Sequence, residues 1–426
     1  MNEVTAPSTQ VPEPPDGSRK CRFCSHALTH TFVDLGTSPL CQKHVTPERF
    51  DEAEAVYPLH VYVCDRCFLV QLPAYVPREE IFDGDYAYFS SYSDSWLRHA
   101  ERYVSMMIGR FDLGSGSQVV EIASNDGYLL QYFVKAGVPV LGVEPTANTA
   151  EAATRKGVPT LNEFFGTETA TRLRISHGPA DVILGNNVLA HVPDINDFVE
   201  GVRTLLAPDG VATFEFPQLM HLVGRGYWDT IYHEHYSYLS FTTVELIFAH
   251  HGLTLFDVEE LPTHGGSIRI YARHAGSGAH AVKPSVAAMK EIEAAAGHYD
   301  LDYYRGFGER VKESKRAILE LLIDIKRRGK TIAGYGAPGK GNTLLNYCGI
   351  GTDFLDYTVD RNPHKQGNFL PGSRIPICAP ELIEETRPDY LFVLPWNLKD
   401  EIAVKMACIL AWGGQFLVAM PEIGIF

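Results

Sequence analysis

The sequence predicts an α/β protein in which two doubly wound domains follow a small cysteine-rich module. Two CxxC motifs lie near the N-terminus. Strand-like apolar runs alternate with helical patterns from Gln118 onward, and a second unit of strand, glycine-rich turn and helix begins near Gly329. Such alternation is typical of parallel sheets covered by helices, which bind ligands at the carboxyl ends of their strands.

These patterns divide the chain into five parts. The first, residues 1–18, is rich in Pro, Ser, Thr and Glu, and we expect it to form a flexible tail. The others are a four-cysteine domain over 19–80, a central α/β domain over 81–280, a helical connector over 281–328 and a C-terminal α/β domain over 329–426.

Composition excludes several classes of protein. A net charge of -15 argues against a nucleic-acid partner, because binding a polyanion requires clustered Lys and Arg. No apolar run approaches the roughly 20 residues that cross a bilayer, and the N-terminus carries no secretory signal. We therefore expect a cytoplasmic protein without a membrane partner. A monomer is expected as well, although no feature of the sequence indicates the oligomeric state. Eight cysteines in such a chain indicate metal ligands or free thiols rather than disulfides.

The two CxxC motifs predict a structural zinc site. Cys21 and Cys24 form one pair, and Cys64 and Cys67 form the other. Two such pairs complete a tetrahedral all-sulfur site, which leaves no open position for a substrate. A redox role for either motif is the alternative, but neither motif sits between a strand and a helix as in thioredoxins. Cys41 is expected to be a buried or spare thiol.

An aromatic segment over residues 81–92 (IFDGDYAYFSSY) joins this module to the central domain. One interpretation is an aromatic plug between the two. The other is a lid over a ligand, in which Tyr86, Tyr88 or Tyr92 offers a phenol.

The first strand of the central domain ends in an unusual turn. Its sequence, EIASNDG over 121–127, lacks the GxGxxG of a dinucleotide site and adds acidic side chains, which suits a cationic sulfonium better than a pyrophosphate. Glu144, after the second strand, is placed to accept both hydroxyls of a ribose. This set resembles the S-adenosylmethionine (SAM) site of class I methyltransferases, a Rossmann-like fold; a domain of this fold without a cofactor is the alternative. The cofactor contacts expected from the resemblance are Glu121, Ser124, Asn125, Gly127, Glu144, Asn162, Asn186 and His191.

The run YHEHY over residues 232–236 concentrates groups that exchange protons near neutral pH. It follows the fourth strand, over 211–216, and should therefore lie beyond the same sheet edge, over the cofactor. The zinc-protease pattern HExxH does not apply, because the second His follows Glu234 directly. A His-rich surface loop or strand edge is the alternative.

The C-terminal domain contains a GxGxxG motif formed by Gly334, Gly336 and Gly339, with Lys340 next to it. Asp360 follows the next strand, where a ribose-binding acid belongs. The turn predicts a diphosphate site at a helix N-terminus, for NAD or for a nucleoside-diphosphate substrate. Trp396 is expected either to contact that ligand or to cap the core.

Taken together, the chain resembles the sugar C3-methyltransferases of deoxysugar biosynthesis, which act on dTDP-linked keto-sugars in antibiotic pathways such as the tetronitrose branch. The resemblance rests on the four cysteines, DGDYAYFSSYS, EIASNDG and YHEHYSYLS. It implies SAM and zinc as cofactors, a dTDP-linked keto-deoxysugar as partner, and His235 as the base. Tyr232, Glu234 and Tyr86 would line the sugar pocket with it. The expected substrate contacts are His191, His264, Gly336, Lys340, Asn342, Trp396 and Asn397.

The chemistry explains why such groups are needed. A ketone beside C3 of the sugar acidifies the C3 proton, so that a neutral His can remove it and leave an enolate for methylation. An ordinary carboxylate is too weak a base, so Glu234 is expected to bind a C3 substituent instead. Two other functions are possible: an NAD-dependent nucleotide-sugar oxidoreductase that uses the C-terminal GxGxxG, and a zinc-ribbon scaffold without activity.

Overall fold

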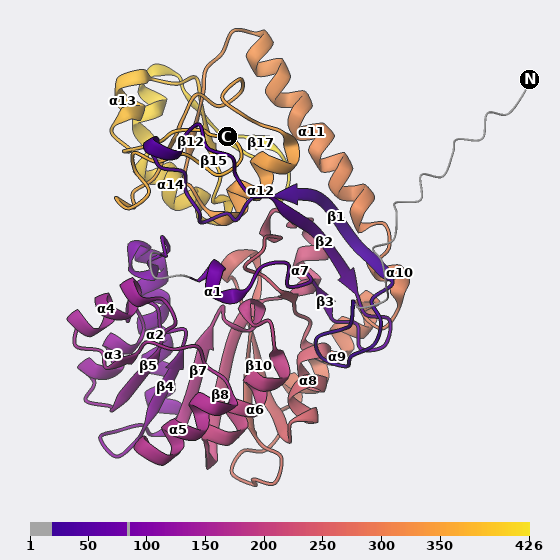
Figure 1. Ribbon diagram of the computed structural model, residues 1–426, viewed down its shortest axis with the longest axis vertical. Coiled ribbons are helices and arrows are strands. Elements are labelled where there is room, and N and C mark those ends of the chain that lie inside the picture. Colours follow the sequence, from indigo (N-terminus) through magenta and orange to yellow (C-terminus); the bar gives the residue numbers. More distant parts are fainter. Residues whose placement is uncertain (1–18, 83–85) are drawn as a thin grey trace, which may run out of the picture.

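The protein, described here by a computed structural model, has three sheets that are packed into one body (Figure 1). The structure describes residues 19–82 and 86–426, so the expected tail over 1–18 lies outside the described residues. Within the described part, no helix is long and apolar enough to cross a membrane.

The N-terminal module is a small antiparallel sheet of order β1-β2-β3-β9. Its strands are β1 (His30–Ser38), β2 (Tyr57–Val63), β3 (Val70–Gln71) and β9 (Ser237–Tyr238). Strand β9 comes from the end of the YHEHYSY segment, and it pairs with β3 in the register Val70↔Tyr238 and Gln71↔Ser237. The zinc module and the central domain therefore share a sheet. The short helix α1 (Arg78–Ile81) leaves the module toward the central domain.

The central sheet has seven strands in the order β10-β11-β8-β7-β4-β5-β6. Five are parallel: β4 (Val119–Ile122), β5 (Val140–Val143), β6 (Thr160–Leu161), β7 (Ala180–Asn186) and β8 (Leu206–Pro217). Strand β11 (Ser267–His274) runs antiparallel to both β8 and β10 (Leu253–Leu261), which departs from an all-parallel sheet. The short connection over 262–266 requires β10 and β11 to be antiparallel to each other, so one of the two must run against the five parallel strands.

Helices cover both faces of this sheet (Figure 1). They are α2 (Asp94–Phe111), α3 (Leu130–Lys135), α4 (Ala147–Arg155), α5 (Thr167–His177), α6 (Ile195–Leu205) and α8 (Phe241–His250). Helix α7 (Leu219–Arg225) instead packs its buried side chains into the apolar cluster of the N-terminal module and the C-terminal part. Helix α2 shows why they form. Ser93 caps its start by accepting a hydrogen bond from the backbone N–H of Trp96, and its buried residues Ala100, Tyr103, Val104 and Met107 repeat at helical spacing on one face.

The C-terminal part begins with three helices and ends in a second α/β layer. The helices are α9 (Pro284–Ala296), α10 (Leu301–Tyr304) and the long α11 (Phe307–Arg327), which lies beside β1 and β2 in Figure 1. The six-stranded sheet has the order β14-β13-β12-β15-β16-β17, and only β17 is antiparallel. Its elements are β12 (Ile332–Tyr335), α12 (Gly339–Cys348), β13 (Thr358–Val359), β14 (Ile377–Cys378), α13 (Leu382–Thr386), β15 (Tyr390–Val393), α14 (Lys399–Lys405), β16 (Gln415–Val418) and β17 (Gly424–Ile425).

One apolar core connects the N-terminal module with the C-terminal part. Phe32 of β1 stacks on Phe307 of α11 with ring centroids 4.5 Å apart, and Trp228, between α7 and β9, belongs to the same buried cluster. Such packing is stabilised by roughly 25 cal/mol for each Å² of apolar surface that is removed from water. The placement of the YHEHY segment, which belongs to the central domain, thus also depends on the N-terminal module and on the C-terminal part.

Candidate active site

The carboxyl ends of the two parallel sheets open onto one cavity of about 910 Å³. From the central sheet it is lined by Asn125 after β4, Glu144 after β5 and Asn186 at the end of β7. From the C-terminal sheet it is lined by Gly336 after β12, Asp360 after β13 and Pro395 after β15. The volume is near the top of the range of about 300–1,000 Å³ for ligand sites, which leaves room for two ligands.

The central-sheet end of the cavity carries polar groups that a ligand can satisfy. Both amide atoms of the buried Asn186 lack a hydrogen-bond partner in the described part of the chain, and a buried amide without a partner is costly. Glu144 accepts hydrogen bonds from the backbone N–H groups of Asn125 at 2.8 Å and of Thr146 at 2.9 Å, and burial raises the pKa of its carboxyl group. A ligand that offers hydroxyl and amino groups, as SAM does, fits this donor and acceptor set.

Four of the expected cofactor residues do not line the cavity: Glu121 in β4, Ser124 and Gly127 in the turn after it, and Asn162 after β6. Gly127 has φ +73, and a Cβ there would lie 3.1 Å from Val158 Cγ2, so its small size serves packing rather than ligand approach. Asn162 donates through Nδ2 to the backbone oxygen of Glu144 at 2.9 Å.

The side chains of Glu121 and Ser124 are enclosed beneath the same turn. Burial raises the pKa of Glu121 well above its usual range, and hydrogen bonding from the Leu130 backbone and the Tyr128 phenol opposes this shift. Ser124 packs against β5, where a Cβ on Gly142 would lie only 2.4 Å from Ser124 Oγ. Asp126, the other acidic side chain here, differs from Glu121 because its carboxylate forms an ion pair with Lys156 at 2.9 Å.

His235 has the geometry of a general base. Its Nδ1 lies 2.7 Å from the backbone oxygen of Thr230, and because a carbonyl can only accept, this nitrogen carries the proton and Nε2 keeps its lone pair. Burial, followed by the neighbouring His191, lowers the pKa of His235 well below its ordinary value. The imidazole is therefore neutral at pH 7, and it lines the cavity with His191, whose ring centroid is 4.7 Å away.

Glu234 is held between two donors. The phenol of Tyr86 donates to Glu234 Oε2 at 2.8 Å, and the thiol of Cys41 donates to Oε1 at 3.3 Å. Burial raises the pKa of Glu234, whereas the bonds from Tyr86 and Cys41 lower it. Cys41, expected from the sequence to be buried or spare, is thus buried against the candidate site from a position 193 residues away along the chain.

The aromatic segment is bound by both α/β domains. On the central side, Asn125 accepts from the backbone N–H of Ser90 at 2.8 Å and donates to the backbone oxygen of Tyr88 at 3.1 Å. On the C-terminal side, Asn362 donates to the backbone oxygen of Ala87 at 2.8 Å. Tyr86, Tyr88 and Tyr92 line the cavity, which favours the lid over the plug.

The C-terminal end of the cavity is built around Lys340. Its Nζ donates to Asn397 Oδ1 at 2.8 Å and lies 4.5 Å from the ring centroid of Trp396. Burial lowers the pKa of Lys340 to about 8, and Asp229 opposes the shift. Lys340 and Asn397 line the cavity together with His264, whereas Trp396 and Asn342 do not.

Side chains of the protein itself contact the GxGxxG turn. Asp360 accepts from the backbone N–H groups of Ala337 at 2.7 Å and of Asn362 at 2.8 Å, so the expected ribose acid braces the turn itself. Gly339 faces the other domains, because a Cβ there would lie 2.9 Å from Cys41 Sγ and 3.4 Å from the Tyr232 ring. These contacts disfavour a dinucleotide at this turn.

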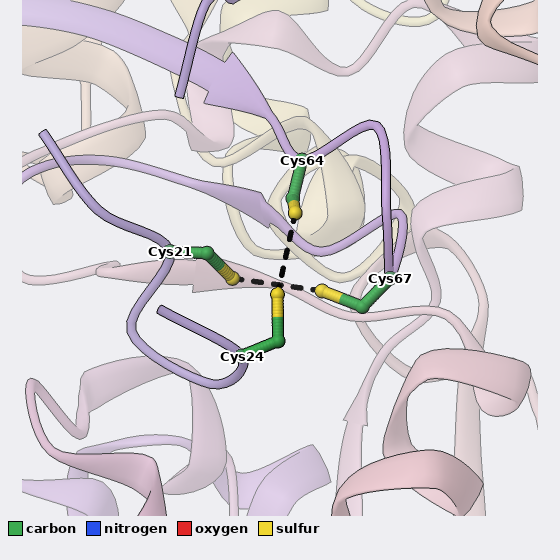
Figure 2. A group of neighbouring side chains, drawn as sticks. All are labelled: Cys21, Cys24, Cys64 and Cys67. Atoms are coloured by element: carbon green, nitrogen blue, oxygen red, sulfur yellow. Dashed lines mark hydrogen bonds between the residues drawn. The ribbon is translucent and has the colours of Figure 1, made fainter. Parts of the chain in front are cut away.

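The four cysteines of the two CxxC motifs converge as expected (Figure 2). The sulfur atoms of Cys21, Cys24, Cys64 and Cys67 all lie within 4.8 Å of one another, as the ligands of a tetrahedral zinc ion require. Gln71 of β3 donates through Nε2 to Cys21 Sγ at 3.2 Å, a supporting bond of the kind that orients metal ligands.

Three family models together match almost all of the described chain. They are a zinc binding domain over residues 21–82, a methyltransferase domain over 96–258 and a C-methyltransferase C-terminal domain over 262–421. The C-methyltransferase NovU of Streptomyces niveus is 38% identical over 403 residues, which cover 95% of this chain and 96% of that protein. The chain belongs to the C-methyltransferase family. It is a SAM-dependent C-methyltransferase with a four-cysteine zinc-binding domain.

More distant matches cover less than half of the chain. The ubiquinone biosynthesis O-methyltransferase of Haemophilus ducreyi is 28% identical over 102 residues, which cover 22% of this chain and 43% of that protein. A solved structure of magnesium protoporphyrin IX methyltransferase from Synechocystis PCC 6803 with bound SAM is 14% identical, covers 41% of this chain and 78% of that chain, and has a TM-score of 0.32. The assignment rests on the full-length relative and not on these.

The zinc module holds the candidate catalytic segment of this C-methyltransferase in place. The backbone N–H of Leu72 donates to the backbone oxygen of Tyr236 at 3.0 Å, next to the β3–β9 pair. His233 bonds through Nε2 to the backbone oxygen of Pro58 at 3.1 Å and so faces the module, away from the cavity. The YHEHY run therefore divides its side chains between the module and the cavity.

Proposed function

We propose that this C-methyltransferase transfers the methyl group of SAM to C3 of a dTDP-linked 4-keto-deoxysugar through an enolate, with His235 as the base. The supporting observation is a neutral imidazole in a cavity that joins the SAM-binding edge to the C-terminal domain. Among residues 19–82 and 86–426, no hydrogen bond is made to its Nε2. The dTDP-linked sugar is proposed from the resemblance and from the charges described below.

The proposed reaction begins with proton transfer to His235. The Nε2 lone pair takes the C3 proton, and the electrons of the C–H bond become those of an enolate with its charge on the C4 oxygen. SAM, when bound, supplies an electrophilic methyl group to that carbon. The proton stays on His235, where the Thr230 carbonyl stabilises the imidazolium through Nδ1, until it is released to solvent.

Tyr232 is a better candidate than Tyr86 for the hydrogen-bond donor to the enolate oxygen. Its ring lies 4.0 Å from that of His235, and burial raises its pKa well above the usual range, so the phenol keeps its proton. The Tyr86 proton is already donated to Glu234. A donor aimed at a developing oxyanion contributes roughly 3–4 kcal/mol to such steps.

Charge at the C-terminal end of the cavity supports an anionic substrate. The chain carries a net charge of -15, yet Lys340, Arg361, Lys365 and Lys405 line this end, together with Asp360 and Glu401. Arg361 and Lys405 form ion pairs with Asp94 and Glu401, so the uncompensated positive charge comes from Lys340 and Lys365. A local positive field can oppose the global one and attract a diphosphate. Lys365 lies at the glycine-rich turn, where its Nζ donates to the backbone oxygen of Ala337 at 2.8 Å.

The test is a methyl-transfer assay with labelled SAM and a panel of dTDP-linked keto-sugars, in which the labelled carbon is located by NMR. We expect label at C3 of a 4-keto substrate. His235→Asn should abolish most transfer while SAM binding by calorimetry is retained, and His177→Asn, on an exposed helix end, serves as the matched control. Normal turnover by His235→Asn, or label at another atom, would refute the assignment.

A further inference from the structure

The turn that orients His235 is held from both sides by the C-terminal domain. The 3-10 helix Trp228–Thr230 supplies the Thr230 carbonyl that accepts from His235 Nδ1. Its neighbour Asp229 accepts a hydrogen bond from Trp396 Nε1 at 2.7 Å. On the other side, the backbone oxygen of Ile231 accepts from Thr343 Oγ1 at 2.9 Å.

These contacts are buried and join distant parts of the chain. Asp229 has no exposed surface, and Trp396 lies 167 residues after it. Thr343 is in α12, 112 residues after Ile231. A hydrogen bond to a buried carboxylate is stronger than one between neutral groups, so this link can fix the turn.

The Asp229 carboxylate takes its side-chain hydrogen-bond donor from the C-terminal domain. Its second oxygen, Oδ1, has no hydrogen-bond partner within residues 19–82 and 86–426. Burial raises the pKa of Asp229 to about 6, and the strongest opposing influence is the charge of Lys340. The side-chain donor and the countercharge thus both come from residues after 329, while the backbone N–H groups of Asp229 and Thr230 also favour the charged carboxylate.

Packing keeps the Trp396 indole aimed at Asp229. The ring stacks on Tyr227 with centroids 4.2 Å apart and an interplanar angle of 18°. Gly265 leaves the space for this pair, because a Cβ there would lie 2.7 Å from both rings. Neither Trp396 nor Asp229 lines the cavity, so both act through the turn and not on a bound ligand.

We propose that Trp396, Asp229 and Thr343 are positioning residues that hold the Thr230 carbonyl against His235 and so make the base depend on the C-terminal domain. The proposal rests on the role of His235 in the proposed function. It gives the C-terminal domain a part in proton transfer in addition to substrate binding. Lys340, which lines the cavity and covers the Trp396 ring, places the proposed substrate site beside this link.

The test uses two conservative substitutions in the full-length zinc-containing enzyme. Trp396→Phe removes the indole donor and keeps an aromatic ring on Tyr227, and Thr343→Val removes the hydroxyl with little change of shape. Trp412→Phe is the matched control, since Trp412 Nε1 donates to the backbone oxygen of Pro388 at 3.0 Å elsewhere in the same domain. Thermal unfolding of each variant checks that it is folded.

The first readout requires no substrate. In protein with ¹⁵N-labelled histidine, the His235 ring signals, assigned by their loss in His235→Asn, report which nitrogen carries the proton. We expect a protonated Nδ1 in the wild type and in Trp412→Phe, and a shifted or mixed state in Trp396→Phe and Thr343→Val. The second readout is kcat with an accepted dTDP-4-keto-sugar, which should fall by about 10- to 100-fold in the two variants while the Kd for SAM is unchanged.

Two results would overturn the proposal. Unchanged His235 signals with reduced kcat would mean that Trp396 and Thr343 act elsewhere, and unchanged signals with unchanged kcat would mean that the link has no role. Failure of the proposed function gives a different pattern. In that case His235→Asn keeps its activity, while the His235 signals of Trp396→Phe still move and support the link.

Discussion

At the scale of single residues, burial sets the charge state of the cavity. His191 and His264 both have a pKa lowered to about 4 by burial, and His235 is shifted in the same direction. The ordinary pKa of histidine is 6.5. An imidazole that stays neutral below that pH can accept a proton over a wider pH range.

The pH profile of the reaction should reflect this shift. A base is active above its pKa, so lowering the pKa of His235 extends activity to lower pH. We expect kcat/KM to show no loss of base function as pH falls from 8 through 6.5, with decline only at lower pH, measured with SAM saturating. A decline centred at 6.5 would point to an exposed histidine as the base.

The charge of Lys340 should limit binding of the nucleotide sugar at alkaline pH. Its pKa is lowered to about 8, so its charge is lost as pH rises through that value. If Lys340 binds the diphosphate, KM for the nucleotide sugar should rise several-fold between pH 7 and 9 while kcat changes little. Lys340→Arg should remove this rise, because a guanidinium keeps its charge throughout.

At the scale of elements, the backbone conformation of the connection between β10 and β11 allows the central domain to pack closely against the C-terminal domain. His264 lies in the left-handed region at φ 52, and Gly265 and Gly266 follow at φ +88 and +129. The two glycines approach Trp396, Tyr227 and His221 and not the cavity. The close backbone approach at these two glycines therefore has protein side chains as its partners.

Gly265→Ala should destabilise the enzyme. The new Cβ would lie 2.7 Å from the Trp396 and Tyr227 rings, in a backbone conformation that side chains avoid. We expect a loss of about 1–3 kcal/mol in the free energy of unfolding by denaturant. Gly276→Ala is the control, since a Cβ there meets nothing within 4 Å, and an equal loss in both variants would contradict this account.

At the scale of the whole molecule, the zinc module supports the catalytic segment. Four sulfur ligands fix the ends of the module, and β3 of that module pairs with β9 directly after the YHEHY run. An ion with four protein ligands contributes to folding rather than to chemistry. Its effect on activity should therefore be indirect.

Removal of zinc should abolish methyl transfer before it abolishes SAM binding. A strong chelator, or Cys24→Ser, frees the module and with it the segment that carries His235. We expect loss of activity together with new protease cleavage near residues 230–240, while the Kd for SAM changes little. Cys408→Ser, whose half-buried thiol is far along the chain, is the control; retained activity after complete zinc loss would show that the module is dispensable.

Stability of the SAM-free protein should fall in mild acid. The folded pKa of His191 and of His264 is about 4, below the ordinary 6.5 of an unfolded chain. Between these values the unfolded state binds more protons, so stability is lost as pH falls from 6.5 toward 4. Thermal unfolding across this range measures the effect, and the paired variant His191→Asn/His264→Asn should show a shallower slope.

Much of the fold follows from local pattern. The CxxC spacing, the strand–turn–helix units and the acids after strands are short-range features, and each corresponds to an element or cluster that forms. The short strand β6 and the antiparallel placement of β11 were not anticipated. A two-residue strand carries no periodicity, and strand direction depends on pairing partners that the pattern does not name.

The sequence by itself determined the zinc ligands, the SAM-binding architecture and the run that carries His235, because each depends on residues close together along the chain. Only the tertiary structure decided that Cys41 contacts Glu234, that Trp396 holds Asp229 and that β3 pairs with β9. Those contacts join segments more than 160 residues apart, and which distant surfaces meet is set by the packing of the whole chain, since no local pattern encodes it.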